Sequence, residues 1–387
     1  MSLDKHFLVF QNKPYITGNE FQYIESAITN RHLSGNGKYT NLCQQFFKEK
    51  YGFRKCLLTT SCTDALEMCA ILLNILPGDE VIMPSFTFVS TANAFILRGA
   101  KIVLADTNLL NPNIDENDFE KLITKNTKAI VVVHYAGIAC NMDSIMAIAN
   151  RHNVFVIEDA AQAVDSFFTG YNNVKQPLGS VGHLATFSFH ESKNIQCGEG
   201  GMLVINDEKF TERAEIIWEK GTNRAAFFRG EVDKYNWVDI GSSFLPSEIT
   251  AAFLYAQLQA LDEIQKVRKE KWQLYYDGLL PLQHKQKVNL PHVPPYATNN
   301  AHIFYLACKN LAERDKLILF LKKKRIQSMF HYPGLHLSPF FLSTHPKTRE
   351  LVNTEKFSDC LLRLPLYIEL EKKKINFIIS LIYEFFQ

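Results

Sequence analysis

Short apolar segments alternate with helical patterns between about residues 55 and 210. We expect strands at Lys55–Thr59, Glu80–Met83, Lys101–Ala105, Ala129–His134, Phe155–Asp159, Ala185–Ser188 and Gly201–Ile205. The helical patterns between them fall at Thr63–Leu73, Val89–Arg98, Ile114–Ile123, Asp143–Asn150 and Asp207–Lys220. This alternation predicts an α/β fold with a mostly parallel central sheet covered by helices. Ligands of such sheets gather at the carboxyl ends of the strands.

The pattern changes after residue 245. A long helical stretch, Glu248–Tyr276, is followed by the Pro-rich passage Leu290–Pro295. One or two strands, including Ile303–Cys308, and two helices, Glu313–Lys323 and Lys372–Phe386, are expected beyond it. Because 387 residues exceed one ordinary core, we expect two domains. Residues 1–245 would form a large α/β domain with an amino-terminal arm, and residues 246–387 a connecting helix with a small α+β domain.

Charge and cysteine content exclude several classes of protein. The 42 basic and 40 acidic residues leave a formal charge of only +2, which argues against nucleic acid or an anionic membrane as partner. The 8 cysteines show neither Cys-x-x-Cys pairs nor zinc-ligand spacing, so no metal site is expected and a reducing cytoplasm fits best. No apolar run reaches the roughly 18–20 residues of a membrane helix.

The most informative motif is Ser188–Asn194, which contains Lys193 and is followed by the glycine cluster Gly198–Gly201. A lysine that attacks a carbonyl must be partly desolvated, because only the neutral amine is nucleophilic. Taken alone, Lys193 is typical of a surface lysine. Its place in a loop after a strand, just before glycines that permit a tight turn, favours a functional role.

Asp159 stands at the carboxyl end of an apolar strand. A carboxylate there either caps a helix or is the partner of a buried cation. The protonated pyridine nitrogen of pyridoxal phosphate is one such cation, and keeping it protonated makes the ring an electron sink. Asp159 and Lys193 together therefore favour a pyridoxal-phosphate site more strongly than either residue alone.

Two further segments suit the same cofactor. The strand Lys55–Thr59 runs into a helix start at Ser61–Thr63, where free amides and the helix dipole can hold a phosphate, although the same residues also cap helices that bind nothing. Ser188 ends another strand and could add a hydroxyl. The segment Pro84–Phe88 brings aromatic rings to the same edge, either to stack on a planar cofactor or to fill the core.

Four motifs in this order, Pro84–Phe88, Glu158–Gln162, Ser188–Asn194 and Gly198–Gly201, resemble the DegT/DnrJ/EryC1/StrS family of sugar aminotransferases. The likeness covers nearly the whole chain, through Leu364–Leu366. It implies the fold type I architecture of aspartate aminotransferase, pyridoxal 5'-phosphate as cofactor, and a homodimer with active sites at the subunit interface.

The resemblance also implies roles for individual residues. Lys193 would be the Schiff-base lysine and Asp159 the partner of the pyridine nitrogen. Gln162 would lie beside the ring, with Phe88 stacked on it. The phosphate would be held by Ser61, Cys62, Thr63 and Ser188. His190 would shape the sugar pocket.

Within the family, the region from Glu219 to Ser243 is similar to transaminases that form dTDP-4-amino-4,6-dideoxygalactose. This likeness implies dTDP-4-keto-6-deoxyglucose and L-glutamate as substrates, in the synthesis of a bacterial surface polysaccharide such as O-antigen or enterobacterial common antigen. Lys220, Arg224 and Arg229 would bind the diphosphate of the sugar nucleotide or the carboxylate of glutamate. Each could equally be a solvent-exposed charge on a loop. Ser243 would reach the partner's cofactor phosphate. His331, Tyr332 and His336 would line the pocket or be structural.

Several alternatives stay open at this point. The same chemistry could give the gluco epimer or a 3-amino sugar, because the outcome depends on which face and carbon of the sugar meet the cofactor. The family's deoxygenating branch carries histidine in place of the lysine, so Lys193 argues against it. A pyridoxal-phosphate-binding regulator is the non-enzyme alternative, although no segment is spare for a nucleic-acid-binding domain.

Overall fold

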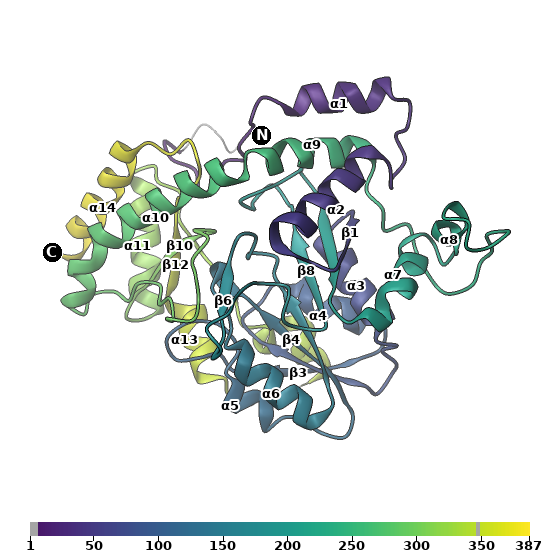
Figure 1. Cartoon of the computed structure of the whole chain (residues 1–387). Coiled ribbons are helices and arrows are strands. Elements are labelled where there is room, and N and C mark those ends of the chain that lie inside the picture. The colour runs from purple at the N-terminus through teal and green to yellow at the C-terminus, as the bar shows by residue number, and fades with distance from the viewer. Residues whose placement is uncertain (1–6, 346–348) are drawn as a thin grey trace.

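The computed structural model, shown in Figure 1, describes residues 7–345 and 349–387. Its main sheet has seven strands in the order β1-β9-β8-β5-β4-β2-β3. These are β1 (Lys55–Thr59), β2 (Glu80–Pro84), β3 (Lys101–Ala105), β4 (Thr127–Val133), β5 (Phe155–Asp159), β8 (Leu184–Ser188) and β9 (Gly201–Ile205). Only β9 runs against its neighbours, so the expected mostly parallel sheet is confirmed.

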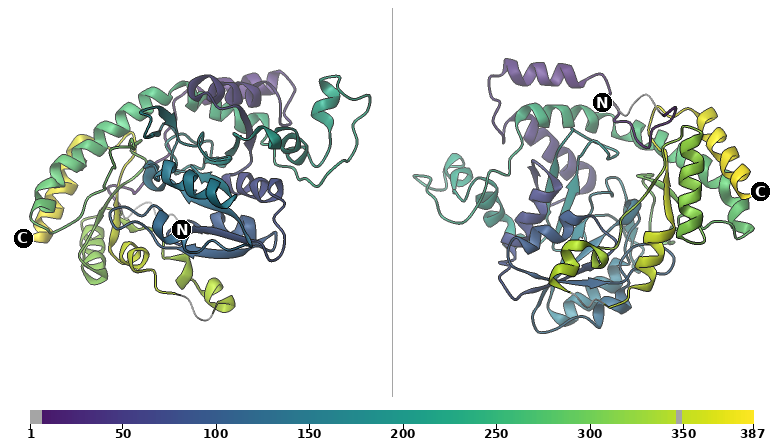
Figure 2. Two further views of the ribbon diagram at one scale, coloured as in Figure 1. Left: turned by 60° about the horizontal axis from the view of Figure 1, so that its bottom comes forward. Right: turned by 180° about the vertical axis from the view of Figure 1, so that it is seen from behind.

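Helices cover both faces of this sheet, as Figure 2 shows. Alternate residues of one strand enter two separate cores: Val156 of β5 packs in one and Ile157 in the other. One core includes α2 (Lys38–Tyr51), α6 (Met142–His152) and α9 (Glu248–Gln259); the other includes α3 (Cys62–Leu72), α4 (Val89–Ile96) and α7 (Thr211–Trp218). Burial on both faces explains why the strands are continuous apolar runs.

The long helix expected at Glu248–Tyr276 is in fact two helices. The helix α9 ends at Gln259 and α10 (Leu261–His284) begins after Ala260. Leu254 of α9 packs in the core of the large sheet, whereas Tyr275 of α10 packs in a core of the carboxyl-terminal part. Because the helix is broken at Ala260, the residues before and after the break can pack in two cores that lie in different places. The spacing of apolar residues along a helix does not show where such a break occurs.

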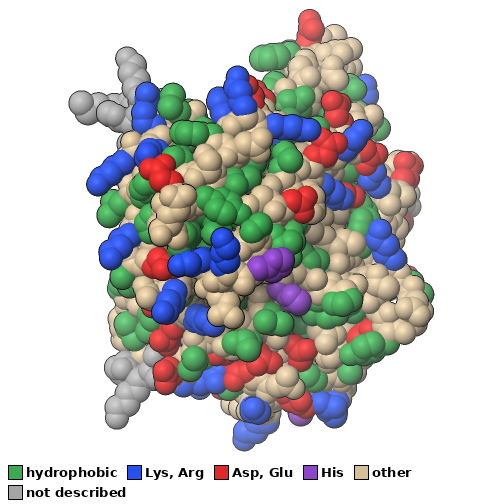
Figure 3. Space-filling view, turned by 90° about the vertical axis from the view of Figure 1, so that its left-hand side faces the viewer, with side chains coloured by type: hydrophobic (Ala, Val, Ile, Leu, Met, Phe, Trp, Pro, Cys, Tyr) green, Lys and Arg blue, Asp and Glu red, His purple; other side chains and the backbone are tan. Residues whose placement is uncertain are grey.

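A second sheet lies in the carboxyl-terminal part. Its strands β10 (Phe304–Ala307), β12 (Leu361–Leu364) and β11 (Met329–Phe330) are antiparallel and lie in that order. The helices α11 (Leu311–Lys323) and α14 (Lys372–Phe386) pack with α10 against it. The outer surface on this side mixes basic and acidic side chains (Figure 3). The domain division at residue 245 stays a prediction; the strands of the seven-stranded sheet all lie before it and those of the three-stranded sheet all lie after it.

The other elements are short or peripheral. They are α1 (Glu20–Thr29), α5 (Glu116–Glu120), β6 (Phe167–Thr169), β7 (Lys175–Pro177), α8 (Arg224–Phe228), α12 (Pro339–Thr344) and α13 (Val352–Cys360), with 3-10 turns η2 (Tyr135–Gly137), η3 (Glu208–Phe210) and η4 (Leu335–Leu337). Among the described residues, no helix is long and apolar enough to cross a membrane. That same part of the chain holds no cluster of three or more His, Cys, Asp or Glu side chains suited to a metal.

A buried carboxylate joins α9 to α2. Glu248, the first residue of α9, accepts hydrogen bonds from the backbone amides of Gly37 (3.1 Å), Tyr39 (2.6 Å) and Thr40 (3.0 Å). These amides belong to the start of α2, where backbone donors lack partners within the helix and the dipole favours negative charge. Glu248 therefore caps α2 from a distant part of the sequence.

We expect Glu248→Gln to lower the free energy of unfolding by about 2 kcal/mol, because the new NH₂ group would face amide donors at a buried position. Denaturant titration followed by circular dichroism measures the change. Glu270→Gln, on an exposed position of α10, is the control and should unfold like the wild type. An unchanged midpoint for Glu248→Gln would contradict this capping role.

Candidate active site

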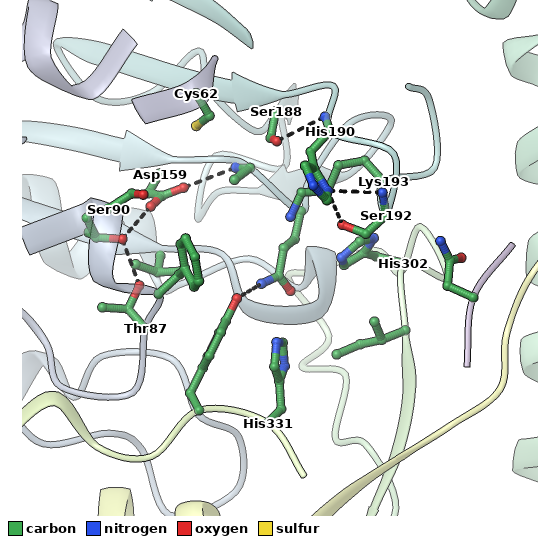
Figure 4. A pocket seen from close by; sticks show the side chains of 18 of the residues that line it. Cys62, Thr87, Ser90, Asp159, Ser188, His190, Ser192, Lys193, His302 and His331 are labelled. Carbon is green, nitrogen blue, oxygen red and sulfur yellow. Dashed lines mark hydrogen bonds between the residues drawn. The ribbon is translucent and has the colours of Figure 1, made fainter. Parts of the chain in front are cut away.

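A cavity of about 600 Å³ opens at the carboxyl ends of the parallel strands. This volume lies in the range of ordinary ligand pockets, roughly 300–1,000 Å³. The expected residues that line it are Ser61, Cys62, Thr63, Phe88, Asp159, Gln162, Ser188, His190, Lys193, His331 and Tyr332. Figure 4 shows how the side chains of β5, β8 and the segment around His331 converge on it. The structure thus brings together residues that are far apart in the sequence.

Lys193 lies in the turn after β8, where its backbone amide donates to the carbonyl of His190 (2.9 Å). Its half-buried side chain lines the cavity, and burial lowers the pKa of its amine. The nearby Cys62 and Asp159 oppose this shift without reversing it. A lysine with a lowered pKa holds more of the neutral, nucleophilic amine at pH 7.

Asp159 ends β5 and is buried. One carboxylate oxygen accepts a hydrogen bond from the Thr91 hydroxyl (2.8 Å) and the other from the Ala161 amide (3.2 Å). Burial raises the pKa of Asp159, while these two hydrogen bonds and the charge of Lys193 oppose the rise. No Lys, Arg or His among the described residues forms an ion pair with it. A fixed, buried carboxylate without a cation fits the protonated nitrogen of pyridoxal phosphate.

The turn between β1 and α3 forms a cradle for an anion. The Ser61 hydroxyl accepts a hydrogen bond from the Asp64 amide (3.0 Å) and so caps α3. The first-turn amides of Cys62 and Thr63 have no acceptor within the helix. Gly201 of β9 lies directly against this turn, since a Cβ there would come within 2.3 Å of the Ser61 carbonyl carbon. The geometry suits a phosphate at the positive end of the α3 dipole.

Two side chains can contact a planar ring held between this cradle and Asp159. The Gln162 amide is fixed, because its oxygen accepts from the Ala136 amide (2.7 Å) and its nitrogen donates to the Tyr332 hydroxyl (3.3 Å). Phe88 lines the cavity and remains 56% exposed, so one of its faces is free to stack. The cavity therefore offers the anion cradle, the carboxylate, the amine and the stacking surface that pyridoxal phosphate requires.

The three candidate pocket residues near the carboxyl terminus have different surroundings. His331 hydrogen-bonds to the Tyr135 hydroxyl (2.7 Å) and stacks on Tyr332 with 3.6 Å between ring centroids, and both rings line the cavity. His336 lies outside the cavity lining. Its Nδ1 is hydrogen-bonded to the Ser85 hydroxyl (2.8 Å), and its Nε2 lies 3.2 Å from a Glu355 oxygen. His336 thus joins the carboxyl-terminal part to the end of β2.

The remaining candidates, Lys220, Arg224, Arg229 and Ser243, line a second cavity of about 810 Å³. Figure 1 shows that the segment around α8 projects from the body of the molecule. The Arg229 guanidinium is engaged by Glu215 (2.8 Å) and Glu231 (2.7 Å). Arg224 lies over the ring of Phe228, 5.1 Å from its centroid. The structure of one chain does not bring these residues to Lys193.

Thr87, Thr91, His302 and Arg363 are among the cavity-lining residues that were not predicted from the sequence. The Thr91 hydroxyl donates its hydrogen to Asp159, so in the 2.8 Å hydrogen bond between Thr87 and Thr91 the donor is Thr87. The two threonines thus form a chain of hydrogen bonds that ends at the carboxylate. Their spacing of four residues in the Ser/Thr-rich segment was the available signal. His302 and Arg363 also line the cavity. Arg363 was detectable as the one charge inside the apolar run Leu361–Leu366.

Comparison with known proteins agrees with this geometry. The model of the DegT/DnrJ/EryC1/StrS aminotransferase family matches residues 14–383. The chain belongs to this family. GDP-perosamine synthase of Caulobacter vibrioides is 32% identical over 372 residues, which cover 95% of both chains. The DegT/DnrJ/EryC1/StrS match makes the protein a pyridoxal-phosphate-dependent sugar aminotransferase.

Solved structures show the same fold. DesV of S. venezuelae, in complex with a ketimine intermediate, is 28% identical, with a TM-score of 0.84 over 95% of this chain and 94% of that one. The sugar aminotransferase Spr1654 of Streptococcus pneumoniae, described as putative, has a TM-score of 0.87 in its PLP form and 23% identity, with 98% of each chain covered. The expected fold type I architecture and the expected cofactor of this family are thereby confirmed.

We expect Gly201→Ala to weaken pyridoxal-phosphate binding at least about tenfold, because the added methyl group would displace the Ser61–Cys62 peptide that forms the cradle. Titration of the apoprotein with the cofactor, followed by absorbance, gives the Kd. Far-UV circular dichroism of the variant controls for folding. A folded Gly201→Ala protein with wild-type cofactor affinity would show that the cradle does not depend on this close contact.

Proposed function

We propose that the enzyme transfers the amino group of L-glutamate to C4 of dTDP-4-keto-6-deoxy-D-glucose. The products are dTDP-4-amino-4,6-dideoxy-D-galactose and 2-oxoglutarate, and the amino sugar enters a bacterial surface polysaccharide such as O-antigen or enterobacterial common antigen. The observation that carries the transamination is the pairing, in one cavity, of the desolvated Lys193 with a buried Asp159 that has no cation. The similarity of residues 219–243 to one branch of the family supports the choice of sugar.

Lys193 is proposed to move the protons of the reaction. Pyridoxal phosphate, when bound, supplies an electron sink that stabilises negative charge at the carbon losing its proton. Burial lowers the pKa of the Lys193 amine and so favours its neutral form, which can take the proton from the α-carbon of glutamate. In the second half of the cycle Lys193 delivers a proton to C4 of the sugar. Asp159 would hold the proton on the cofactor's ring nitrogen throughout.

The histidines beside Lys193 do not compete for this proton. Burial, followed by the charges of Arg363 and Lys193, holds the pKa of His331 well below its usual range. Burial has the same effect on the pKa of His302, whose ring nitrogen lies 3.0 Å from the Asn194 amide oxygen. Both rings are therefore neutral at pH 7 and serve as hydrogen-bonding groups for the substrate, while Lys193 remains the proton carrier.

A second copy of the chain is proposed to complete each active site. Lys220, Arg224 and Ser243 lie away from Lys193, in the second cavity. The surrounding segment exposes large rings, including Phe228 (69%) and Trp237 (82%), which suit burial against another chain. In the proposed homodimer these residues reach the partner's active site, where Arg224 and Lys220 contact the substrate and Ser243 the cofactor phosphate.

Two alternatives rest on specific observations. GDP-perosamine synthase, one of the similar proteins, makes GDP the rival nucleotide. The pleiotropic regulatory protein of Geobacillus stearothermophilus, 33% identical over 327 residues and covering 84% of this chain and 83% of its own, favours the regulator as second candidate. A change of cofactor absorbance on adding glutamate would select the enzyme over the regulator, since binding alone moves no amino group.

Lys193→Ala is expected to reduce turnover by at least about a thousandfold, because it removes both the covalent link to the cofactor and the proton carrier. Stopped assays for 2-oxoglutarate measure the loss. The absorbance band of the cofactor joined to lysine should disappear in the same variant. Lys209→Ala, at an exposed position, serves as the control. Normal activity of Lys193→Ala would contradict the proposed mechanism.

The choice of sugar is tested by incubating the enzyme with glutamate and either dTDP-4-keto-6-deoxyglucose or its GDP-linked counterpart. Proton NMR couplings of the product separate the galacto from the gluco configuration and C4 from C3 amination. Turnover of the dTDP substrate to the galacto product is the expected result. A gluco product, a 3-amino product or a requirement for GDP would replace the substrate proposal and leave the transamination intact.

The shared active site is tested by mixing two inactive variants, Lys193→Ala and Arg224→Ala, after dissociation and reassembly. Each hybrid dimer then holds one site with both native contributions, so random mixing should restore about a quarter of the wild-type activity. Activity assays before and after mixing measure the gain. If Arg224 acts within its own chain, mixing should restore nothing.

A further inference from the structure

Arg363 occupies an unusual position in the cavity. It is the third residue of β12, the middle strand of the small sheet. Its neighbours Leu362 and Leu364 pack in the carboxyl-terminal core, so the strand alternation turns Arg363 the other way. Its side chain lines the cavity that contains Lys193. The small sheet thereby carries a guanidinium into a site built mainly by the large one.

The guanidinium has no partner among the described residues. Its Nε is buried without a hydrogen bond, and no carboxylate of the described chain forms an ion pair with it. An unpaired buried cation is costly, and native proteins usually pair it or reserve it for a ligand. The N–H groups of the Arg363 guanidinium therefore indicate an anionic ligand that comes from outside the chain.

The acidic residues of the cavity cannot supply that anion. Asp159 is held by Thr91 and Ala161, and the expected cofactor nitrogen is its cation. Glu199 is 71% exposed and lies 3.6 Å from the His190 ring. The cofactor phosphate belongs at the start of α3. Among the charges of this cavity, Arg363 is thus the cation that remains to be matched by a substrate.

We propose that Arg363 binds a carboxylate of the amino-acid donor. This rests on the transamination proposed above, in which the donor must place its α-carbon beside Lys193. Arg363, Lys193 and His331 all line this one cavity, and the two positive charges help to lower the pKa of His331. A guanidinium offers two parallel N–H donors that match the two oxygens of a carboxylate. Lys220, Arg224 and Arg229 are left for the sugar nucleotide, on the other chain.

Two inert probes separate the donor from the sugar nucleotide: glutarate, which has the carboxylates of glutamate without its amine, and dTDP. Calorimetry on the cofactor-loaded enzyme measures both affinities. In Arg363→Lys the glutarate Kd should rise about 10- to 100-fold, since the forked hydrogen bonds are lost, while the dTDP Kd stays within about threefold. Arg314→Lys is the matched control, because Arg314 lies in the same sheet-and-helix unit but donates to Asp315 and Ser358 outside the cavity.

Arg363→Leu should abolish glutarate binding and slow the glutamate-driven change of cofactor absorbance. Circular dichroism and the unfolding midpoint show whether each variant is folded. Unchanged glutarate affinity in a folded Arg363→Lys, or weakening of dTDP alone or of both probes equally, would overturn the proposal. A wild-type enzyme that binds glutarate but shows no absorbance change with glutamate would refute the transamination instead, so the two failures are distinguishable.

Discussion

The shielding of Lys193 and Asp159 from water is the constraint on which the site depends. The half-buried amine and the buried carboxylate both lose hydration, and neither forms an ion pair with another residue of the described chain. The fold compensates by fixing them: Thr91 and Ala161 hold the carboxylate, and the turn after β8 holds the lysine. Groups with perturbed pKa values that are held in place in this way cluster at catalytic centres.

Two adjacent carboxylates at the end of β5 have different roles because they face different surroundings. Glu158 and Asp159 are neighbours on β5, yet their side chains enter opposite faces of the sheet. Glu158 is surrounded by donors: it lies 2.8 Å from the His134 ring and accepts from the amides of Gly179 and Gly182. Although burial opposes it, these contacts hold the pKa of Glu158 below its usual value. Glu158 thus anchors the loop from Gly179 to Gly182. Asp159 forms no ion pair within the described chain and can therefore accept a cation from a ligand.

The small sheet completes the cavity and must therefore be held in register with the large one. Asp106, which follows β3, accepts hydrogen bonds from the amides of Asn353 (3.1 Å) and Thr354 (2.8 Å) at the start of α13. His336 makes a second connection through Ser85 at the end of β2. Held in this way, the carboxyl-terminal part contributes Tyr332 and Arg363 to the cavity that contains Lys193. His336 is thus a link between the two parts, which explains its absence from the cavity lining.

The sequence by itself determined the strands of the large sheet and the helix start at Ser61–Thr63, and it singled out Lys193 and Asp159 as the proposed catalytic pair, because each of these depends on residues close together in the chain. Tertiary structure decided the rest. It divided the helix at Ala260, because two cores lie in different directions. It placed Arg224 and Lys193 in different cavities and Arg363 in the same cavity as Lys193. The charges and spacing in a sequence do not reveal which side chains will share a cavity. Local patterns fix local structure, whereas the pairing of distant charges depends on packing.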